Sequence, residues 1–466
     1  MARRRWGLAA LVVAGLTVAG ITPASAVHGG VPGDFNGDGY RDAVLPAPGA
    51  NVSGKEAAGA VVVLYGSSSG LSASRRKTIT QNTAGVPGAA EKWDAFGAAT
   101  ATADLNRDGY ADLVVGTPDE DTPQGADVGL VTVLWGSANG LTGGTNLPSL
   151  GSGPRYGQDI AAVSTGRDSR TRLSIASRFA AVHFQGPFTR AGEVGGGYLD
   201  TNTGSVLSVT LGDFDQDGQP DPAVATVRDG DLTGGRIHTG LPLVQELRGN
   251  GLITAAGDIN GDGFADLAVG DPDEPRQAGV DGEPGGRVLV WYGSASGIAT
   301  DAEPVEITQN TAGVPGASEK HDAFGGALAV ADLNRDGLAD IVVGSPYENL
   351  AKNRAGHVTV IPGRASGALG TGAYTFSQDT PGVPGASEID DFFGTTVSVG
   401  DVNKDGKPDL FVGASGENNF AGAVWVLPGG STRPTATGSK MFTAAAVGLT
   451  QQNGTLLGGN GLLWVI

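Results

Sequence analysis

The sequence predicts an all-β fold, a single seven-bladed β-propeller over residues 27–466. A nonapeptide of the form Asp-x-Asn/Asp-x-Asp-Gly-x-x-Asp occurs six times. Short aliphatic runs rich in β-branched residues follow the copies, as is typical of β-strands. The copies stand 45 to 109 residues apart, and all but the widest interval suit the four short strands of one propeller blade.

The first 26 residues have the pattern of a signal peptide. Basic residues 3–5 precede an apolar stretch, Leu8–Ile21, and the segment ends at Ala24-Ser25-Ala26, a small-residue cleavage site. The apolar stretch is shorter than the ~20 residues that a membrane span needs. We therefore expect a secreted, extracellular protein that starts near Val27, with no membrane span in the mature chain.

Composition excludes several classes of function. The chain has no cysteine, which rules out disulfides, thiolate nucleophiles and iron-sulfur clusters. Its net charge of -19 disfavours a nucleic-acid partner, because such binding depends on basic side chains. We expect a monomer whose partner is an extracellular protein or glycan that the sequence does not identify. The 79 glycines have no Gly-X-Y period and indicate a fold rich in tight turns.

The nonapeptide has the chemistry of a calcium loop. Oxygen side chains at positions 1, 3 and 5 point into one small loop, which the glycine at position 6 allows to close. Position 7 varies freely, as a ligand that acts through its main-chain carbonyl can, and Asp at position 9 completes the shell. About six calcium ions are expected. The candidate ligands are Asp34, Asn36, Asp38, Tyr40 and Asp42; Asp104, Asn106, Asp108, Tyr110 and Asp112; Asp213, Asp215, Asp217, Gln219 and Asp221; Asp258, Asn260, Asp262, Phe264 and Asp266; Asp332, Asn334, Asp336, Leu338 and Asp340; and Asp401, Asn403, Asp405, Lys407 and Asp409.

Helical calcium hands need a carboxylate at position 12 of the loop. Here position 12 is Leu or Val in all six copies and lies within a predicted strand. The loops are therefore expected to connect two strands of a β-hairpin. A turn without an ion is the alternative, but its carboxylates would repel one another.

The repeat extends beyond the loop. A strand that often opens with Phe-Gly precedes the loop, and three further strands follow it, for example near Val114, Val133 and, in the first unit, Ile79. The widest interval holds a degenerate copy at Ser164–Arg172 that we expect to bind no calcium, although it keeps Asp168. Loops then begin near residues 34, 104, 164, 213, 258, 332 and 401. Residues 430–466 are expected to close the ring, with no strands assigned.

Two segments of the chain are nearly identical. Residues 79–97 and 307–325 differ only at Ala90/Ser318 and Trp93/His321. The second difference indicates either a position that contacts a ligand or drift in an exposed loop.

No catalytic constellation stands out. Gly66-Ser67-Ser68-Ser69-Gly70 fits the G-x-S-x-G nucleophile pattern, but equivalent turns at 136–140 and 293–297 carry Ala at the central position. The histidines show no metal-ligand spacing. We therefore expect that the protein is not an enzyme.

The order of Phe-Gly, calcium loop and Gly-x-Pro resembles the FG-GAP repeat of integrin alpha N-terminal propellers and of secreted bacterial proteins. The resemblance implies hairpin calcium sites on one face and ligand-binding loops on the other. It suggests an extracellular ligand-binding module of the adhesion type. Alternatives are a glycan-binding propeller and the accessory propeller of an extracellular hydrolase.

Overall fold

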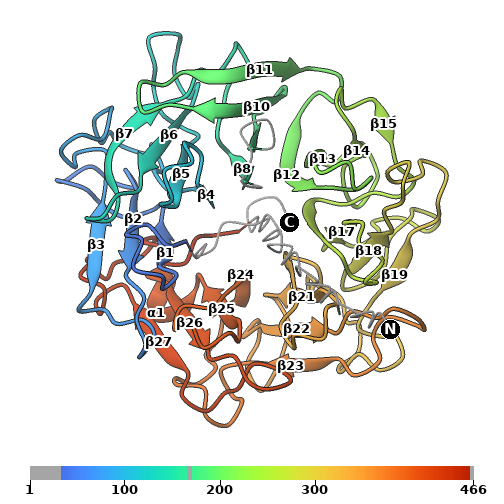
Figure 1. The fold of residues 1–466 in the computed structure, drawn as a ribbon. Coiled ribbons are helices and arrows are strands. Elements are labelled where there is room, and N and C mark those ends of the chain that lie inside the picture. The colour runs from blue at the N-terminus through green and yellow to red at the C-terminus, as the bar shows by residue number, and fades with distance from the viewer. Residues whose placement is uncertain (1–32, 165–170, 462–466) are drawn as a thin grey trace, which may run out of the picture.

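A computed structural model describes residues 33–164 and 171–461, so the predicted signal peptide lies outside it. Seven antiparallel sheets stand around a central axis as the blades of a ring (Figure 1). The seven-bladed propeller is thus confirmed. None of the helices in these two ranges is long and apolar enough to cross a membrane.

Each blade is one sheet whose strands pair in chain order. The first three blades hold β1 (Ala43–Ala47), β2 (Ala60–Leu64) and β3 (Arg76–Ile79); β4 (Ala99–Ala103), β5 (Asp112–Thr117), β6 (Leu130–Trp135) and β7 (Thr142–Asn146); and β8 (Asp159–Val163), β9 (Arg172–Ala176), β10 (Ala181–Phe188) and β11 (Val194–Asp200). The fourth and fifth hold β12 (Val206–Gly212), β13 (Asp221–Thr226), β14 (Ile237–Thr239) and β15 (Gln245–Glu246); and β16 (Ile253–Gly257), β17 (Asp266–Asp271), β18 (Arg287–Trp291) and β19 (Val305–Ile307). The last two hold β20 (Ala327–Ala331), β21 (Asp340–Ser345), β22 (His357–Ile361) and β23 (Tyr374–Phe376); and β24 (Phe393–Gly400), β25 (Asp409–Ala414), β26 (Ala423–Leu427) and β27 (Lys440–Thr443), with one helical turn, α1 (Glu417–Phe420), between β25 and β26.

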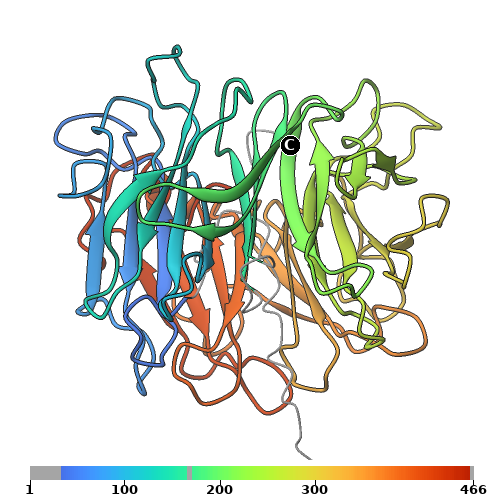
Figure 2. The ribbon, with the colours of Figure 1, turned by 45° about the horizontal axis from the view of Figure 1, so that its top comes forward.

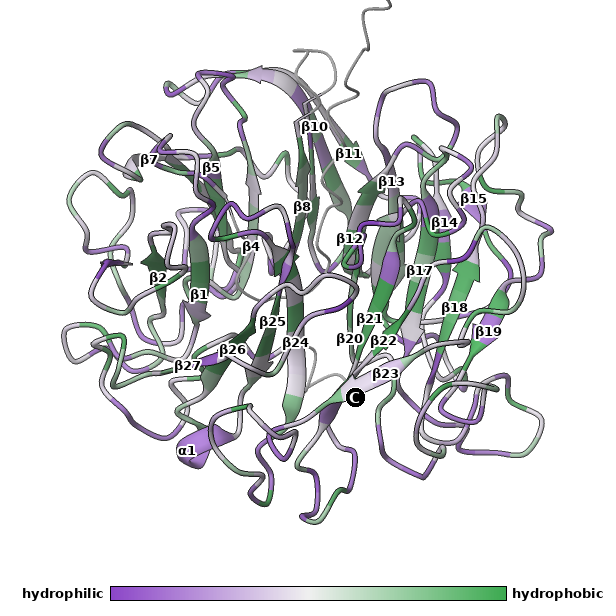
Figure 3. Cartoon of the chain, turned by 60° about the horizontal axis from the view of Figure 1, so that its bottom comes forward, coloured by the Kyte–Doolittle hydropathy of each residue, from purple (hydrophilic) through white to green (hydrophobic). Residues whose placement is uncertain are grey.

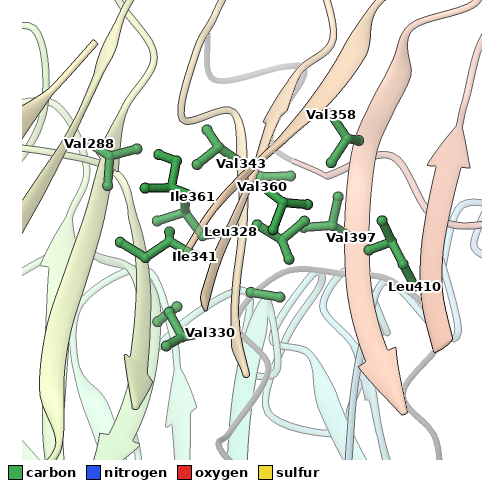
Figure 4. Packing of buried hydrophobic residues seen from close by; sticks show 14 of the residues in the cluster. Val288, Leu328, Val330, Ile341, Val343, Val358, Val360, Ile361, Val397 and Leu410 are labelled. Carbon is green, nitrogen blue, oxygen red and sulfur yellow. The ribbon is translucent and has the colours of Figure 1, made fainter. Parts of the chain in front are cut away.

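The middle strands of a blade are apolar along their whole length because both of their faces are covered. β2 and β25 are buried at every residue, whereas the outermost β3 and β15 are largely exposed. In Figure 3 middle strands such as β17, β18 and β25 are largely green, that is, hydrophobic. Aliphatic side chains of adjacent blades pack together, as Val288, Ile341 and Val397 do among blades five to seven (Figure 4). The core therefore runs between the blades around the ring.

The Phe-Gly pair lies just before the strand that it was expected to open in two of three blades. β4 begins at Ala99 and β20 at Ala327, whereas β24 does begin at Phe393. Phe96 is fully buried and forms a parallel bridge with Gly59 of the preceding blade. The pair thus joins neighbouring blades.

The degenerate copy forms a complete blade. Tyr156 occupies the place of Phe96, since it is buried and bridges Gly129 of the preceding blade. β8 and β9 pair in register from Asp159 with Ala176 to Val163 with Arg172. The loop between them lies largely outside the described residues, and so does Asp168.

The two ends of the described chain meet at the first blade, where β1, β2 and β3 are the described strands. The N–H of Gly458 donates to Pro46 O at 2.7 Å, as the N–H of Gly97 donates to Gly116 O in the second blade. The N–H of Leu457 donates to Ala421 O at 2.9 Å. Leu457-Gly458 therefore takes the Phe-Gly position of the first blade, which agrees with the expected closure of the ring. The fourth strand of the last blade, β27, lies within residues 430–466, where the sequence alone assigns no strand.

Candidate metal centres in the hairpin loops

Five of the six acidic loops connect the first and second strands of their blades, and the loop at Asp34 stands directly before β1, which corresponds to the second strand of the other blades. Strand direction alternates within a blade, so these loops and the turns between third and fourth strands lie on one face of the ring (Figure 2). The connections between second and third strands, and those from one blade to the next, lie on the opposite face. We call these the loop face and the junction face.

Hydrogen bonds within each loop aim its oxygen atoms inward. In the first loop, Asp34 accepts the N–H of Gly37 at 2.7 Å and of Gly39 at 2.8 Å. The amide oxygen of Asn36 accepts the N–H of Asp38 at 2.9 Å, and Asp38 accepts the N–H of Tyr40 at 2.9 Å. The loop at Asp258 has the same set of bonds. The side chains at positions 1, 3 and 5 are thus held within one small loop, and their role as metal ligands stays a prediction.

The fourth blade has the most acidic of these loops. One carboxylate oxygen from each of Asp213, Asp215 and Asp217 lies within 4.8 Å of the others. Burial, together with the charges of these three residues, raises the pKa of Asp221 to about 7. Crowded carboxylates in an all-oxygen donor set fit a hard cation such as calcium. Arg172 of the preceding blade is close to this loop, since the charges of Asp217 and Asp221 act on its pKa.

The Asp at position 9 has a bracing role, which means that its carboxylate holds the loop to the rest of the blade through main-chain hydrogen bonds. The sequence does not indicate this role. Asp266 is fully buried and accepts the N–H of Ile259 at 2.8 Å and the N–H of Gly293 at 3.0 Å. Burial raises its pKa to about 7. The same pair of bonds recurs at Asp42, Asp112, Asp340 and Asp409. This carboxylate ties the loop to the end of the third strand, and its role as a metal ligand stays a prediction.

Main-chain bonds link three of the loops to the loop of the next blade. The N–H at position 8 of one loop donates to the carbonyl at position 1 of the preceding loop: Ala111 to Asp34 at 2.9 Å and Ala339 to Asp258 at 2.7 Å. Ala265 donates to Asp213 in the same way at 3.0 Å. We therefore expect a change in the shape of one of these loops to move the bonded loop of the next blade.

Arg172 stands at position 9 of the degenerate loop. Its guanidinium donates to Gln185 Oε1 at 2.9 Å and to Gln219 Oε1 at 2.5 Å. A positive charge takes the place of the carboxylate found in the six other loops. This is consistent with the prediction that the degenerate loop holds no calcium, which stays a prediction.

The G-x-S-x-G segment is a turn between β2 and β3, as residues 136–140 are between β6 and β7. Ser67 Oγ donates to Gly70 O at 2.9 Å, and Ser137 and Ser294 make the same bond in their blades. No helix follows the segment, as the nucleophile motif would require. The interpretation of this segment as a glycine turn agrees with the structure.

Sequence reasoning missed three groups of buried polar side chains on the junction face. Each consists of a Gln, an Asp and a Glu, with the Gln amide bonded to the Glu carboxylate. A 39-residue spacing, from Gln81 to Glu120, Gln309 to Glu348 and Gln378 to Glu417, could have indicated them.

Comparison with known proteins agrees with this architecture. The FG-GAP repeat matches residues 26–64, 96–134, 250–291, 324–361 and 393–427. Integrin alpha pat-2 of Caenorhabditis briggsae is 31% identical over 46% of this chain and 17% of its own length. Integrin alpha-5 of Xenopus laevis is 30% identical over 45% of this chain and 20% of its own length. Phosphatidylinositol-glycan-specific phospholipase D of Mus musculus is 36% identical over 21% of this chain and 11% of its own length.

The ring and its repeated acidic hairpins define the class as a seven-bladed β-propeller of the kind found in integrin alpha chains. FG-GAP repeats make up five of the chain's seven blades, and integrin alpha chains are among its relatives. It spans about a fifth or less of the length of these three relatives.

Proposed function

We propose that the protein is a secreted, calcium-stabilised propeller that binds an extracellular ligand through its junction face. The repetition of one acidic loop geometry around the loop face carries the proposal. Six loops with the same inward oxygen atoms suit ions that stabilise the fold. Their uniformity gives little to distinguish one ligand from another.

The junction face differs from blade to blade. Trp93, His321 and Asp390 hold equivalent places before the Phe-Gly position, and all three have a positive φ near 70°. Such a conformation is unfavourable for residues other than glycine and is often kept at functional sites. Trp93 is 54% exposed, and Ile389, which precedes Asp390 in the chain, is 64% exposed. These tips offer apolar contacts to a ligand.

Binding by the junction face can be tested with a double variant, Trp93→Ala with Ile389→Ala. Val244→Ala is a matched control because Val244 is similarly exposed, at 62%, but lies in a turn of the loop face. Each protein is immobilised and exposed to secreted proteins and to a glycan array, in calcium and in chelator. We expect retention in calcium by wild type and control, and its loss in the double variant and in chelator. Equal retention by the double variant would contradict the assignment of this face.

The match to phosphatidylinositol-glycan-specific phospholipase D favours a second candidate, the accessory propeller of a hydrolase. In that case the propeller would hold a substrate for a catalytic unit that the described ring does not contain. A direct test fuses this chain to a phospholipase and measures activity on lipid-anchored substrate. Faster cleavage with the propeller than without it would support this candidate.

A further inference from the structure

Three junctions between blades bury a Gln, an Asp and a Glu together. The groups are Gln81, Asp94 and Glu120; Gln309, Asp322 and Glu348; and Gln378, Asp391 and Glu417. We call them the junction sites. In each, the Gln follows the last strand of one blade and its Nε2 donates to the Glu of the next blade, at 2.6, 2.6 and 2.7 Å respectively. All nine side chains belong to residues at most 8% exposed.

The Asp of each junction site comes from the connection that leads into the next blade. Asp94, Asp322 and Asp391 each accept the N–H of the residue three positions earlier, at 2.5 to 2.6 Å. In each site the charge of one carboxylate raises the pKa of the other: Asp94 acts on Glu120, Glu348 on Asp322, and Asp391 on Glu417. The two carboxylates of a site are therefore close to each other. In the last site the Gln378 amide also hydrogen-bonds to Asp391 and so lies between the two carboxylates.

Positive charge is missing around these carboxylates. Within the described ranges, no Lys or Arg forms an ion pair with any of the six. His357 Nδ1 lies 3.9 Å from Glu348, but burial lowers the pKa of His357 to about 4, so its ring is neutral at pH 7. Burial and mutual repulsion raise the pKa of Glu120, Asp322 and Glu417 to about 7. Two buried carboxylates without a counter-charge are costly.

Buried oxygen atoms without a hydrogen-bond partner indicate which kind of group the junction sites lack. The Oε1 atoms of Gln81, Gln309 and Gln378 are buried and have no hydrogen-bond partner, and neither does Oδ1 of Asp322. A proton shared by the carboxylates would leave the amide oxygen unsatisfied. Once the amide has turned to face the Glu with its oxygen, a cation would satisfy the amide oxygen and the carboxylates together, because these oxygens are its ordinary ligands. A turn of the amide about its last bond would bring Oε1 beside the Glu as a second ligand.

Comparison of blades within the chain indicates that the Gln, the Asp and the Glu of a junction site act together. The connection from β15 to β16 is short, and its residues 247–252 include neither Gln nor Asp. The equivalent Glu of that blade, Glu274, instead accepts His321 Nδ1 at 2.7 Å. Gln and Asp thus occur together with the Glu at three junctions and are lost together at this one.

We propose that the three junction sites bind a hard divalent cation of the calcium class, held by the Asp and Glu carboxylates and the Gln amide oxygen. These sites are separate from the hairpin loops, because they lie on the opposite face and join two blades. Each ion would tie the end of one blade to the start of the next.

Calcium stoichiometry tests this proposal directly. The triple variant Glu120→Gln, Glu348→Gln and Glu417→Gln keeps side-chain size and removes one carboxylate from each site. Glu246→Gln is the control, because Glu246 pairs with Arg236 on the outermost strand of the fourth blade. Bound calcium is measured by equilibrium dialysis on the full chain, with folding checked by circular dichroism. We expect three fewer ions in the triple variant than in wild type, and no change in the control. This difference does not depend on how many ions the hairpin loops hold.

A second measurement uses the wild type and so does not depend on how the variant folds. Crystals are soaked in terbium, which replaces calcium and scatters anomalously. We expect an anomalous peak between Asp and Glu at each junction site. Equal stoichiometry in the folded triple variant, or ordered water without an anomalous peak at all three sites, would overturn the proposal.

Discussion

Replacement of Asp266 by Asn separates the bracing role of position 9 from calcium binding. The carboxylate accepts main-chain N–H groups of Ile259 and Gly293 with its two oxygens. An Asn side chain has one oxygen, so its NH2 group must face one of these N–H donors. Both donors were paired with a charged acceptor that is fully buried.

The magnitude follows from the lost bond and its buried surroundings. A hydrogen bond to a charged group contributes about 1.5–3 kcal/mol, and a buried donor without a partner adds about 1–3 kcal/mol. These contributions overlap, so we expect Asp266→Asn to lower the free energy of unfolding by about 2–4 kcal/mol. The loss should appear even in chelator, where no ion is bound.

The assay is urea denaturation in chelator at pH 8, above the pKa of about 7, so that Asp266 is ionised. Asp262→Asn is the control, because Asp262 is exposed and accepts the N–H of Phe264 and the Asn260 side chain at the loop surface. In chelator it should change stability by less than ~0.5 kcal/mol. In calcium it should lose stabilisation that the wild type gains. An Asp266→Asn protein as stable as wild type in chelator would refute the bracing role.

Three further outcomes are expected. Calcium at about 100 times its dissociation constant should stabilise the fold by ~2.7 kcal/mol per loop, so calorimetry in chelator should show a lower Tm, and an unchanged Tm would contradict structural calcium. Burial lowers the pKa of His183 to about 4, although the charge of Asp200 opposes the shift, so the unfolded chain takes up a proton near pH 6.5 that the folded chain does not. Stability should therefore fall by up to ~3 kcal/mol as pH drops from 6.5 to 4, and denaturation of His183→Gln should lack this part of the loss. Gly458→Ala should lower the Tm more than Gly454→Ala: both have a positive φ, but a Cβ at Gly458 would lie 2.8 Å from Val424 whereas one at Gly454 meets nothing within 4 Å.

Most of the fold could be predicted because each blade repeats its local signals. The acidic nonapeptide marks a hairpin, and the aliphatic runs beside it mark strands with both faces buried. Even the degenerate third blade was recognisable, since Tyr156-Gly157 keeps the place of Phe96-Gly97. The predicted start of β4 and of β20 was wrong, because the Phe-Gly pair contacts the preceding blade instead of beginning the strand. The pattern of apolar residues within one blade does not indicate such a contact.

The less predictable parts depend on contacts between distant residues. Leu457-Gly458 shares one residue of the Phe-Gly pattern, and its role appears only when the chain ends meet. Position 9 of the loops looks like one more cation ligand in sequence, whereas its second partner, such as Gly293, lies a strand away. Gln81 and Glu120 belong to different blades and resemble ordinary surface residues until the ring buries them.

Both faces of the ring hold carboxylates that lie close together and repel one another. On the loop face, carboxylates of one hairpin crowd together, and main-chain bonds such as Ala339 to Asp258 pass their geometry to the next blade. On the junction face, carboxylates from a single blade meet the Gln of the blade before it, so a cation there would act directly between blades. Loss of ions from the hairpins should loosen individual loops, whereas loss from the junction sites should loosen contacts between blades. Hydrogen exchange can distinguish these, because only the second should increase exchange at the buried amides of Phe96 and Phe393, which bond to the preceding blade.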